Sequence, residues 1–269
     1  MSFTTFIGVL LGFGLFAASV FLSTDNYWIF LNLPSIIMVL GGTLAATLIS
    51  YELRYFMLAL KSLGHVMITP KVGRYLLNFE VGRMIRWGYV LQSKGLPGLE
   101  SEAKKARRDD PFLNFGIELL ITGYPGENLR TILENTAETT FERNMIQVKV
   151  LRFMASTAPA FGMIGTLVGL MVMLDTMGSD PSQLGPGMAI ALCTTLYGVL
   201  VARLVFMPAA NKIQQRQEIV RFRNYLLVEG FSMLADKKSP RYIQDSMNSY
   251  LDPAIHFDID KQIRKKSAR

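Results

Sequence analysis

Four long apolar stretches without a charged side chain constrain the fold of this 269-residue chain more than any other feature of its sequence. They are residues 3–22, 30–50, 153–174 and 187–202, the last of which continues past Arg203 to Met207. A helix rises 1.5 Å per residue, so about 20 apolar residues cross the roughly 30 Å hydrocarbon core of a bilayer. Because no water reaches that core, backbone polar groups must pair within each segment, which favours helices. The sequence therefore predicts an all-α membrane protein with four transmembrane helices.

Lysine and arginine are confined to two blocks of the chain, which sets the expected orientation in the membrane. All 28 of them fall within residues 54–152 and 203–269, and the short connections 23–28 and 175–186 contain none. Loops rich in Lys and Arg stay on the cytoplasmic side of a membrane. We therefore expect the two short connections to face outward, and the long middle segment and both termini to lie in the cytoplasm.

The order of spans and charged segments predicts four parts. They are a first transmembrane hairpin (1–52), a cytoplasmic helical region (53–150), a second transmembrane hairpin (151–208) and a basic cytoplasmic tail (209–269). In the middle region, apolar residues of 127–148 recur at helical spacing and lead into the third span without a helix breaker. This continuity favours helical cytoplasmic extensions of the membrane helices, and a separate small helical bundle is the alternative.

Composition and missing motifs exclude several classes of protein. Half of the residues are apolar and only 18% are charged, below the roughly 25% of an ordinary soluble domain. The one cysteine, Cys193, excludes a disulfide-built fold. The basic residues lie where a membrane protein has them, so the high pI does not indicate nucleic-acid binding. Because no nucleotide or zinc motif is present and His65 and His256 lie far apart, we expect no enzyme and no tightly bound cofactor.

The four apolar stretches contain no Asp or Glu, although ion pathways through membranes commonly use an acidic side chain. A carboxylate for ion passage must therefore come from another chain. The second hairpin does place hydroxyl groups in mid-span, at Thr166, Thr194 and Thr195. Hydroxyl oxygens suit small hard cations, so a transient Na⁺ near Thr194 and Thr195 is the metal contact we expect, with no other metal. The alternative is that these threonines bond to their own helix and pack against neighbouring helices.

Small residues and prolines mark where the spans contact one another or bend. Two pairs of glycines have the four-residue spacing that permits close helix contact, Gly8 with Gly12 and Gly165 with Gly169. Pro159 and Pro208 bracket the second hairpin. Since proline lacks an N–H and bends a helix, these two positions are either hinges or ordinary kinks.

Three segments together resemble the MotA/PomA family of flagellar stator subunits, within the MotA/TolQ/ExbB proton channel superfamily. They are residues 158–170 (APAFGMIGTLVGL), 184–198 (LGPGMAIALCTTLYG) and 208–212 (PAANK). The resemblance implies a homo-oligomer, a ring of five copies around two copies of a single-span MotB/PomB-type partner. That partner carries the ion-binding Asp and a peptidoglycan-binding domain. The resemblance also implies a multi-pass protein of the bacterial inner membrane that contacts lipid and acts on the rotor protein FliG.

The resemblance assigns roles to residues of the second hairpin. Pro159 and Pro208 match the two prolines that the family associates with coupling ion flow to movement. Thr166, Thr194 and Thr195 match threonines that line the ion path in sodium-driven members. The transported ion is therefore expected to be Na⁺ rather than H⁺, although a hydroxyl near the site is not unique to sodium users.

The same resemblance assigns the rotor contact to a cytoplasmic loop. Glu100 matches the acidic residue that faces the rotor, whereas Gln92 stands where the family usually has arginine and Lys94 is the nearest basic residue. The expected function is a flagellar motor stator subunit that forms an ion channel with its partner and converts sodium- or proton-motive force into torque. The alternatives are an ExbB/TolQ-like energiser of envelope proteins, which generally has three spans, and a non-conducting membrane scaffold.

Overall fold

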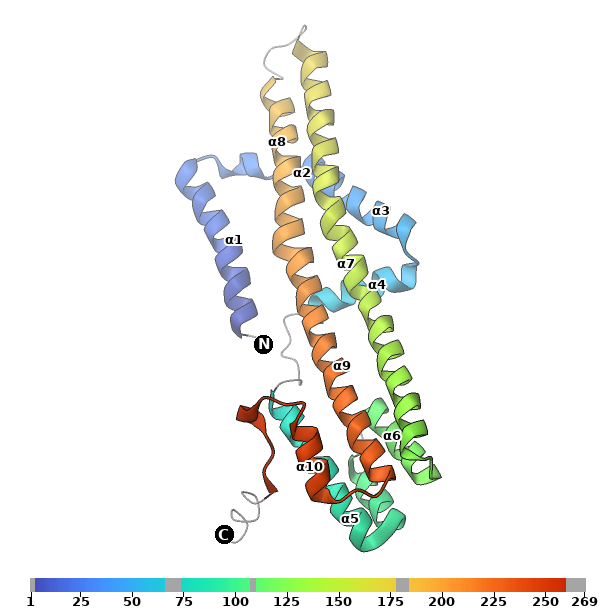
Figure 1. Ribbon diagram of the computed structural model, residues 1–269. Coiled ribbons are helices and arrows are strands. Elements are labelled where there is room, and N and C mark those ends of the chain that lie inside the picture. The colour runs from blue at the N-terminus through green and yellow to red at the C-terminus, as the bar shows by residue number, and fades with distance from the viewer. Residues whose placement is uncertain (1–2, 66–73, 107–109, 178–183, 260–269) are drawn as a thin grey trace. The chain divides into compact units, whose positions relative to one another are not determined.

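The described part of the chain is a set of helices with no strand, which confirms the all-α prediction (Figure 1). The structure is a computed structural model that describes residues 3–65, 74–106, 110–177 and 184–259. The connection predicted at 175–186 and the end of the basic tail lie partly outside these residues. The α-helices are α1 (Phe3–Ser23), α2 (Leu33–Ile36), α3 (Gly42–Ser50), α4 (Leu53–His65), α5 (Arg74–Ala106), α6 (Pro111–Thr122), α7 (Gly126–Met177), α8 (Leu184–Leu200), α9 (Met207–Ala235) and α10 (Pro240–Asn248).

Short helical segments of other kinds join or interrupt these helices. Two are 3₁₀ turns, η1 (Tyr27–Phe30) and η5 (Pro253–Ile255), and two are π-helical, η2 (Ile37–Gly41) between α2 and α3, and η4 (Val201–Phe206) between α8 and α9. Four largely helical stretches of the described chain are long and apolar enough to cross a membrane, which confirms the four predicted spans. They lie within Phe6–Ser23, Tyr27–Ser50, Gly126–Asp175 and Leu184–Ala235.

The chain divides into two compact units, each built from segments that are far apart in the sequence. The first comprises residues 1–69 and 144–215, and the second comprises residues 70–143 and 216–269. Helix α7 contributes residues to both units, as does α9. The predicted extension of the third span is therefore present as the unbroken helix α7. The four predicted parts follow chain order, whereas each compact unit combines segments from different parts.

In the first unit, α7 and α8 lie side by side because glycines line their contact (Figure 1). A Cβ added at Gly169 would lie 2.7 Å from the backbone nitrogen of Ala191, and one at Gly198 would lie 2.8 Å from the carbonyl oxygen of Ala158. No real Cβ approaches backbone atoms so closely, so only glycine permits this helix separation. The predicted packing role of the Gly165–Gly169 pair is thus confirmed.

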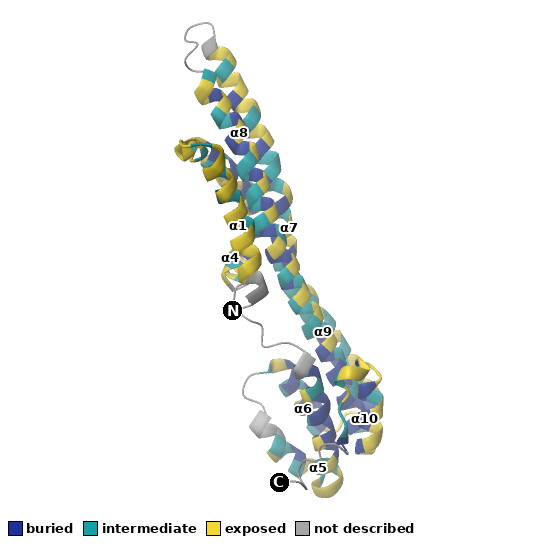
Figure 2. Cartoon of the chain, turned by 90° about the vertical axis from the view of Figure 1, so that its left-hand side faces the viewer, coloured by how far each residue is buried: buried dark blue, intermediate teal, exposed yellow. Residues whose placement is uncertain are grey.

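Helix α1 buries almost none of its apolar surface within the chain. Only 6% of its membrane-spanning window is buried, and Figure 2 colours it almost wholly as exposed. Leu15 and Leu22 are 68% and 89% exposed. Exposed apolar patches of this size mark surfaces that membrane or another protein covers. For a helix of this length and composition, that surface is suited to lipid.

The second unit has its own apolar core around Trp87, Leu113 and Phe231, and a buried ion cluster beside it. Glu80 is 1% exposed and accepts hydrogen bonds from Arg223, at 3.0 Å from Nε and 2.7 Å from one terminal nitrogen. Arg223 also pairs with Asp110, whose other oxygen caps the start of α6. Burial favours the neutral form of Arg223, but the charges of Glu80 and Asp110 outweigh it and raise the pKa of Arg223. The ion pairs of this cluster therefore link α5, the start of α6 and α9.

Candidate functional site

The structure brings two of the three predicted ion-path threonines into direct contact. Thr166 of α7 and Thr195 of α8 have their hydroxyl oxygens 2.6 Å apart. The Thr166 oxygen also lies 3.1 Å from each of the carbonyl oxygens of Gly162 and Ala191. Thr195 is exposed and Thr166 is half-buried. The result is a cluster of four neutral oxygens that opens on the surface of the α7–α8 pair.

The third threonine, Thr194, has different surroundings from its neighbour. It is fully buried, and its hydroxyl bonds back along α8 to the carbonyl oxygens of Ile190 (3.0 Å) and Ala191 (2.9 Å). Its side chain lies over Gly165 of α7, where an added Cβ would come within 2.5 Å of the Thr194 methyl group. Thr194 therefore packs between the two helices and bonds to its own helix, as the alternative to ion binding predicted for these threonines. Whether it also meets an ion stays a prediction.

The described residues contain no group of three or more His, Cys, Asp or Glu side chains that could hold a metal ion. The oxygens at Thr166 and Thr195 are all uncharged. Bringing a cation into a low-dielectric region costs several kcal/mol unless an opposite charge is present. This cluster can thus supply ligands to a small cation but not the charge that such a site needs.

The two predicted coupling prolines lie at structurally distinct points of the second hairpin. Pro159 is half-buried within α7, and a Cβ added at Gly198 of α8 would come 3.1 Å from its Cα, so this turn of α7 packs closely against α8. Pro208 is exposed at the start of α9, directly after the π-helical segment η4. Proline offers no N–H, and its ring crowds the carbonyl of the residue four positions before it, here Leu204. The wider turns of the π-helical segment η4 accommodate the crowding between the Pro208 ring and this carbonyl group. The coupling roles of both residues stay predictions.

The segment assigned to the rotor contact bends sharply at Gly95. This residue has φ +65° and ψ −166° inside α5, a conformation that residues with a side chain rarely adopt, and Pro97 begins the second half of the helix. Gln92 and Lys94 are exposed before the bend, and Glu100 is half-buried after it. The bend thus separates the acidic residue from the other two.

Two lysines that the sequence reasoning did not connect with this loop lie beside Gln92. Lys237 and Lys238, in the turn after α9, line one hollow together with Gln92, Gly95 and residues 96–97. Both lysines are exposed, and Lys237 has the left-handed backbone angle φ 53°. The only available signal was the basic character of the tail, which does not reveal the spatial neighbour. The structure therefore places positive charge next to Gln92, the position where the resemblance implies an arginine.

Tyr197 is a second residue that sequence reasoning left without a role. Its hydroxyl donates to the carbonyl oxygen of Phe30 and accepts a hydrogen bond of 3.0 Å from the backbone N–H of Asn32. The Asn32 side chain in turn caps α2 by accepting from the backbone N–H of Ser35. Tyr197 therefore connects α8 with residues 30–32, where η1 ends and α2 begins.

Comparison with known proteins identifies the family. The model of the MotA/TolQ/ExbB proton channel family matches residues 104–224. The chain is 30% identical to the chemotaxis protein PomA of Vibrio alginolyticus over 252 residues, which cover 94% of this chain and 96% of that protein. The chain belongs to the MotA/TolQ/ExbB proton channel family.

Two further relatives match this chain over most of their own length. Motility protein A of Cereibacter sphaeroides is 32% identical over 243 residues, 89% of each chain. The uncharacterized protein YtxD of Bacillus subtilis is 35% identical over 218 residues, 81% of this chain and 78% of that one. Within the family the chain is thus a flagellar stator subunit, which confirms that prediction over the ExbB/TolQ-like alternative.

Two solved structures have the same fold as this family member. The structure of C. jejuni MotAB has a TM-score of 0.83 at 20% identity, and the match covers 94% of this chain and 97% of that one. The flagellar MotAB stator complex from Bacillus subtilis has a TM-score of 0.81 at 22% identity with the same coverage.

Proposed function

We propose that this stator subunit forms an ion channel with a single-span MotB/PomB-type partner and converts sodium-motive force into torque on the flagellar rotor. The observation that carries the proposal is the exposed Thr166–Thr195 hydroxyl pair, set on an otherwise apolar surface of the second hairpin. The similar solved structures contain MotA together with MotB. A carboxylate on such a partner would supply the negative charge that the oxygen cluster lacks.

In this mechanism Na⁺ passes between the partner's carboxylate and the oxygens of Thr166 and Thr195. Loading the ion neutralises a charge that is costly in a low-dielectric region, and releasing it restores that charge. The cycle can therefore shift the preferred position of the ring relative to the partner. Sodium is favoured over the proton because a hard metal cation needs oxygen ligands such as these hydroxyl and carbonyl groups. A carboxylate that carries a proton does not need them.

The test is a comparison of three isosteric substitutions, each of which removes one hydroxyl. The strain lacks its own stators, expresses this chain with its partner, and swims at different Na⁺ concentrations. Thr195→Val and Thr166→Val are expected to raise the Na⁺ concentration for half-maximal speed about tenfold, which corresponds to about 1.4 kcal/mol. Thr194→Val is the matched control, since that hydroxyl bonds only to its own helix in the structure. Equal effects of Thr194→Val and Thr195→Val would refute this pathway, and swimming without Na⁺ would favour protons.

We further propose that both termini and the second compact unit lie in the cytoplasm, and that five copies form the ring. The distribution of Lys and Arg supports this orientation. The largely unburied surface of the membrane helices agrees with assembly and with lipid contact. Labelling of single cysteines with a membrane-impermeant reagent tests the orientation. A cysteine at Ser249 should react only after the membrane is opened, whereas a cysteine at Asn26 should react in intact spheroplasts.

The bend in α5 and the lysines beside it are the proposed contact with the rotor protein FliG. Glu100 and Lys94 lie on either side of the bend, and Lys237 and Lys238 supply the positive charge that Gln92 does not carry. Charges on such a surface act over a Debye length of about 8 Å at physiological salt. This contact therefore depends on the group of charged residues around the bend rather than on one residue alone.

A further inference from the structure

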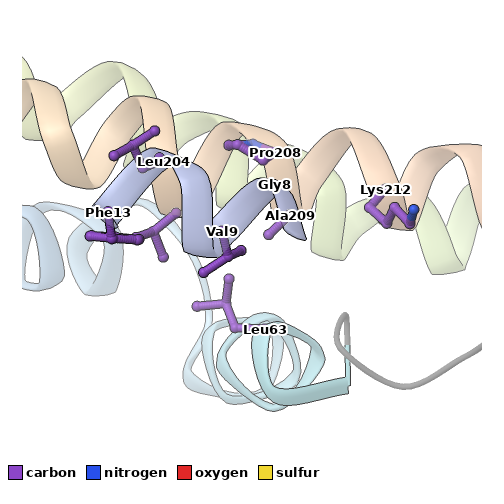
Figure 3. Close-up of a pocket in the computed structure, with 10 residues that line it drawn as sticks. Gly8, Val9, Phe13, Leu63, Leu204, Pro208, Ala209 and Lys212 are labelled. Carbon is purple, nitrogen blue, oxygen red and sulfur yellow. The ribbon is translucent and has the colours of Figure 1, made fainter. Parts of the chain in front are cut away.

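A groove on the first unit is bordered by α1, α4, η4 and α9 (Figure 3). Its volume is about 450 Å³, and apart from Lys212 every lining residue among those described is apolar or a glycine. Figure 3 shows Val9 of α1 and Leu63 of α4 pointing toward each other, below Leu204 and Pro208. The groove thus combines a long apolar wall with one positive charge.

Glycine keeps one side of this groove open. A Cβ added at Gly8 would have no atom within 4 Å, whereas one at Gly12 would touch a methyl group of Leu204 at 3.2 Å. The Gly8–Gly12 spacing therefore does not hold two helices in contact along its length. At Gly8 it leaves space that another molecule can enter.

We propose that this groove binds one acyl chain of an anionic phospholipid whose phosphate is held by Lys212. The lining offers an incoming chain no polar partner except Lys212, which suits a hydrocarbon tail and leaves the polar groups of a non-helical peptide unpaired. A groove of about 450 Å³ with an apolar wall and one basic side chain is suited to a hydrocarbon chain that carries an anionic headgroup.

Charge favours an anionic lipid over a neutral one. Lys212 lies one helical turn beyond Pro208, at the end of the apolar part of the fourth span. A basic side chain near the membrane surface favours binding of an anionic headgroup about fivefold. Because Pro208 also lines the groove, a bound chain contacts the proline that is proposed to couple ion flow to movement. That consequence rests on the proposed function, whereas lipid binding itself does not.

Photolabelling of the full-length chain with its partner in nanodiscs tests the site. The probe is phosphatidylglycerol with a diazirine in its acyl chain, and labelled peptides are mapped by mass spectrometry. We expect adducts on residues 8–13, at Leu63 and on residues 204–209. Gly8→Leu should lower them about tenfold by filling the groove. Gly14→Leu is the matched control, because a Cβ there also meets no atom within 4 Å and Gly14 does not line the groove.

Lys212 provides an independent test that leaves the apolar wall intact. Lys212→Gln should reduce labelling by phosphatidylglycerol about fivefold, to the level seen with phosphatidylcholine, and Lys212→Arg should preserve it. Equal labelling by the two lipids in the unsubstituted protein would overturn the headgroup assignment. Equal adducts in Gly8→Leu and Gly14→Leu would overturn the groove. Cross-links from a photoreactive residue at Leu63 to a second copy, without lipid adducts, would assign the groove to a subunit contact instead.

Discussion

Replacing Gly169 with alanine is expected to separate α7 from α8 and to impair both stability and motor function. The added Cβ would lie 2.7 Å from the Ala191 nitrogen and 2.9 Å from the Gly187 carbonyl oxygen. Both are backbone atoms, so no side chain can rotate away. Raising the shorter distance to the 3.4 Å of ordinary contact requires the helices to separate by about 0.7 Å. Overpacking of this kind costs typically about 1–3 kcal/mol.

The same separation acts on the oxygen cluster one turn away. It would stretch the Thr166–Thr195 contact from 2.6 Å to about 3.3 Å, beyond the usual range for hydroxyl pairs. We therefore expect thermal unfolding of the purified subunit to occur roughly 3–10 °C lower and swimming to be largely lost at normal membrane levels of protein. Gly185→Ala on α8 is the control, since its added Cβ meets nothing within 4 Å. An unchanged unfolding temperature together with normal swimming in Gly169→Ala would refute the argument.

Two further predictions concern the second unit. Arg223→Met should destabilise the chain by about 3–5 kcal/mol, because it leaves the buried Glu80 with a single partner; Arg221→Met, which removes a half-exposed pair, should cost at most about 1 kcal/mol. Because the pKa of Arg223 is raised, its contribution to stability is fully present below the unfolded-state pKa and is lost only as pH rises through the folded-state pKa. Denaturant unfolding should therefore show the same difference in stability between Arg223→Met and the unsubstituted chain at pH 7 and at pH 9. The double substitution Lys237→Glu with Lys238→Glu should sharply reduce swimming speed at normal expression. Adding Gln92→Arg to this double variant should partly restore the speed. A double variant that swims normally would show that these lysines do not contact the rotor.

The spans could be predicted from the sequence because the thickness of the bilayer fixes how long a charge-free helix must be. The glycine spacing in the second hairpin likewise indicated a close helix contact. The sequence did not distinguish Thr194 from Thr195, since adjacent residues on a helix point about 100° apart and only the position of α7 decides which one it covers. The Thr166–Thr195 pair exists because two helices meet at that depth.

Long-range neighbours account for most of what sequence reasoning missed. Lys237 lies beside Gln92 only because the core around Trp87 and Phe231 packs the end of α9 against α5. The π-helical segment before Pro208 is a local effect of proline, but its extent depends on how α8 and α9 pack. The sequence therefore predicted the fold and the candidate residues, whereas their grouping required the three-dimensional contacts.

The use of hydroxyls rather than a carboxylate follows from what each group costs when no ion is bound. In the proposed ring, an acidic side chain on every copy would leave a charge without a counter-charge wherever the partner is absent, at a cost of several kcal/mol each. The hydroxyls of Thr166 and Thr195 instead satisfy each other at 2.6 Å, so an empty site carries no unpaired charge. Placing the carboxylate on the partner confines ion binding to the points where partner and ring meet. The subunit can then present the same oxygens at every position and bind an ion only where the partner's charge arrives.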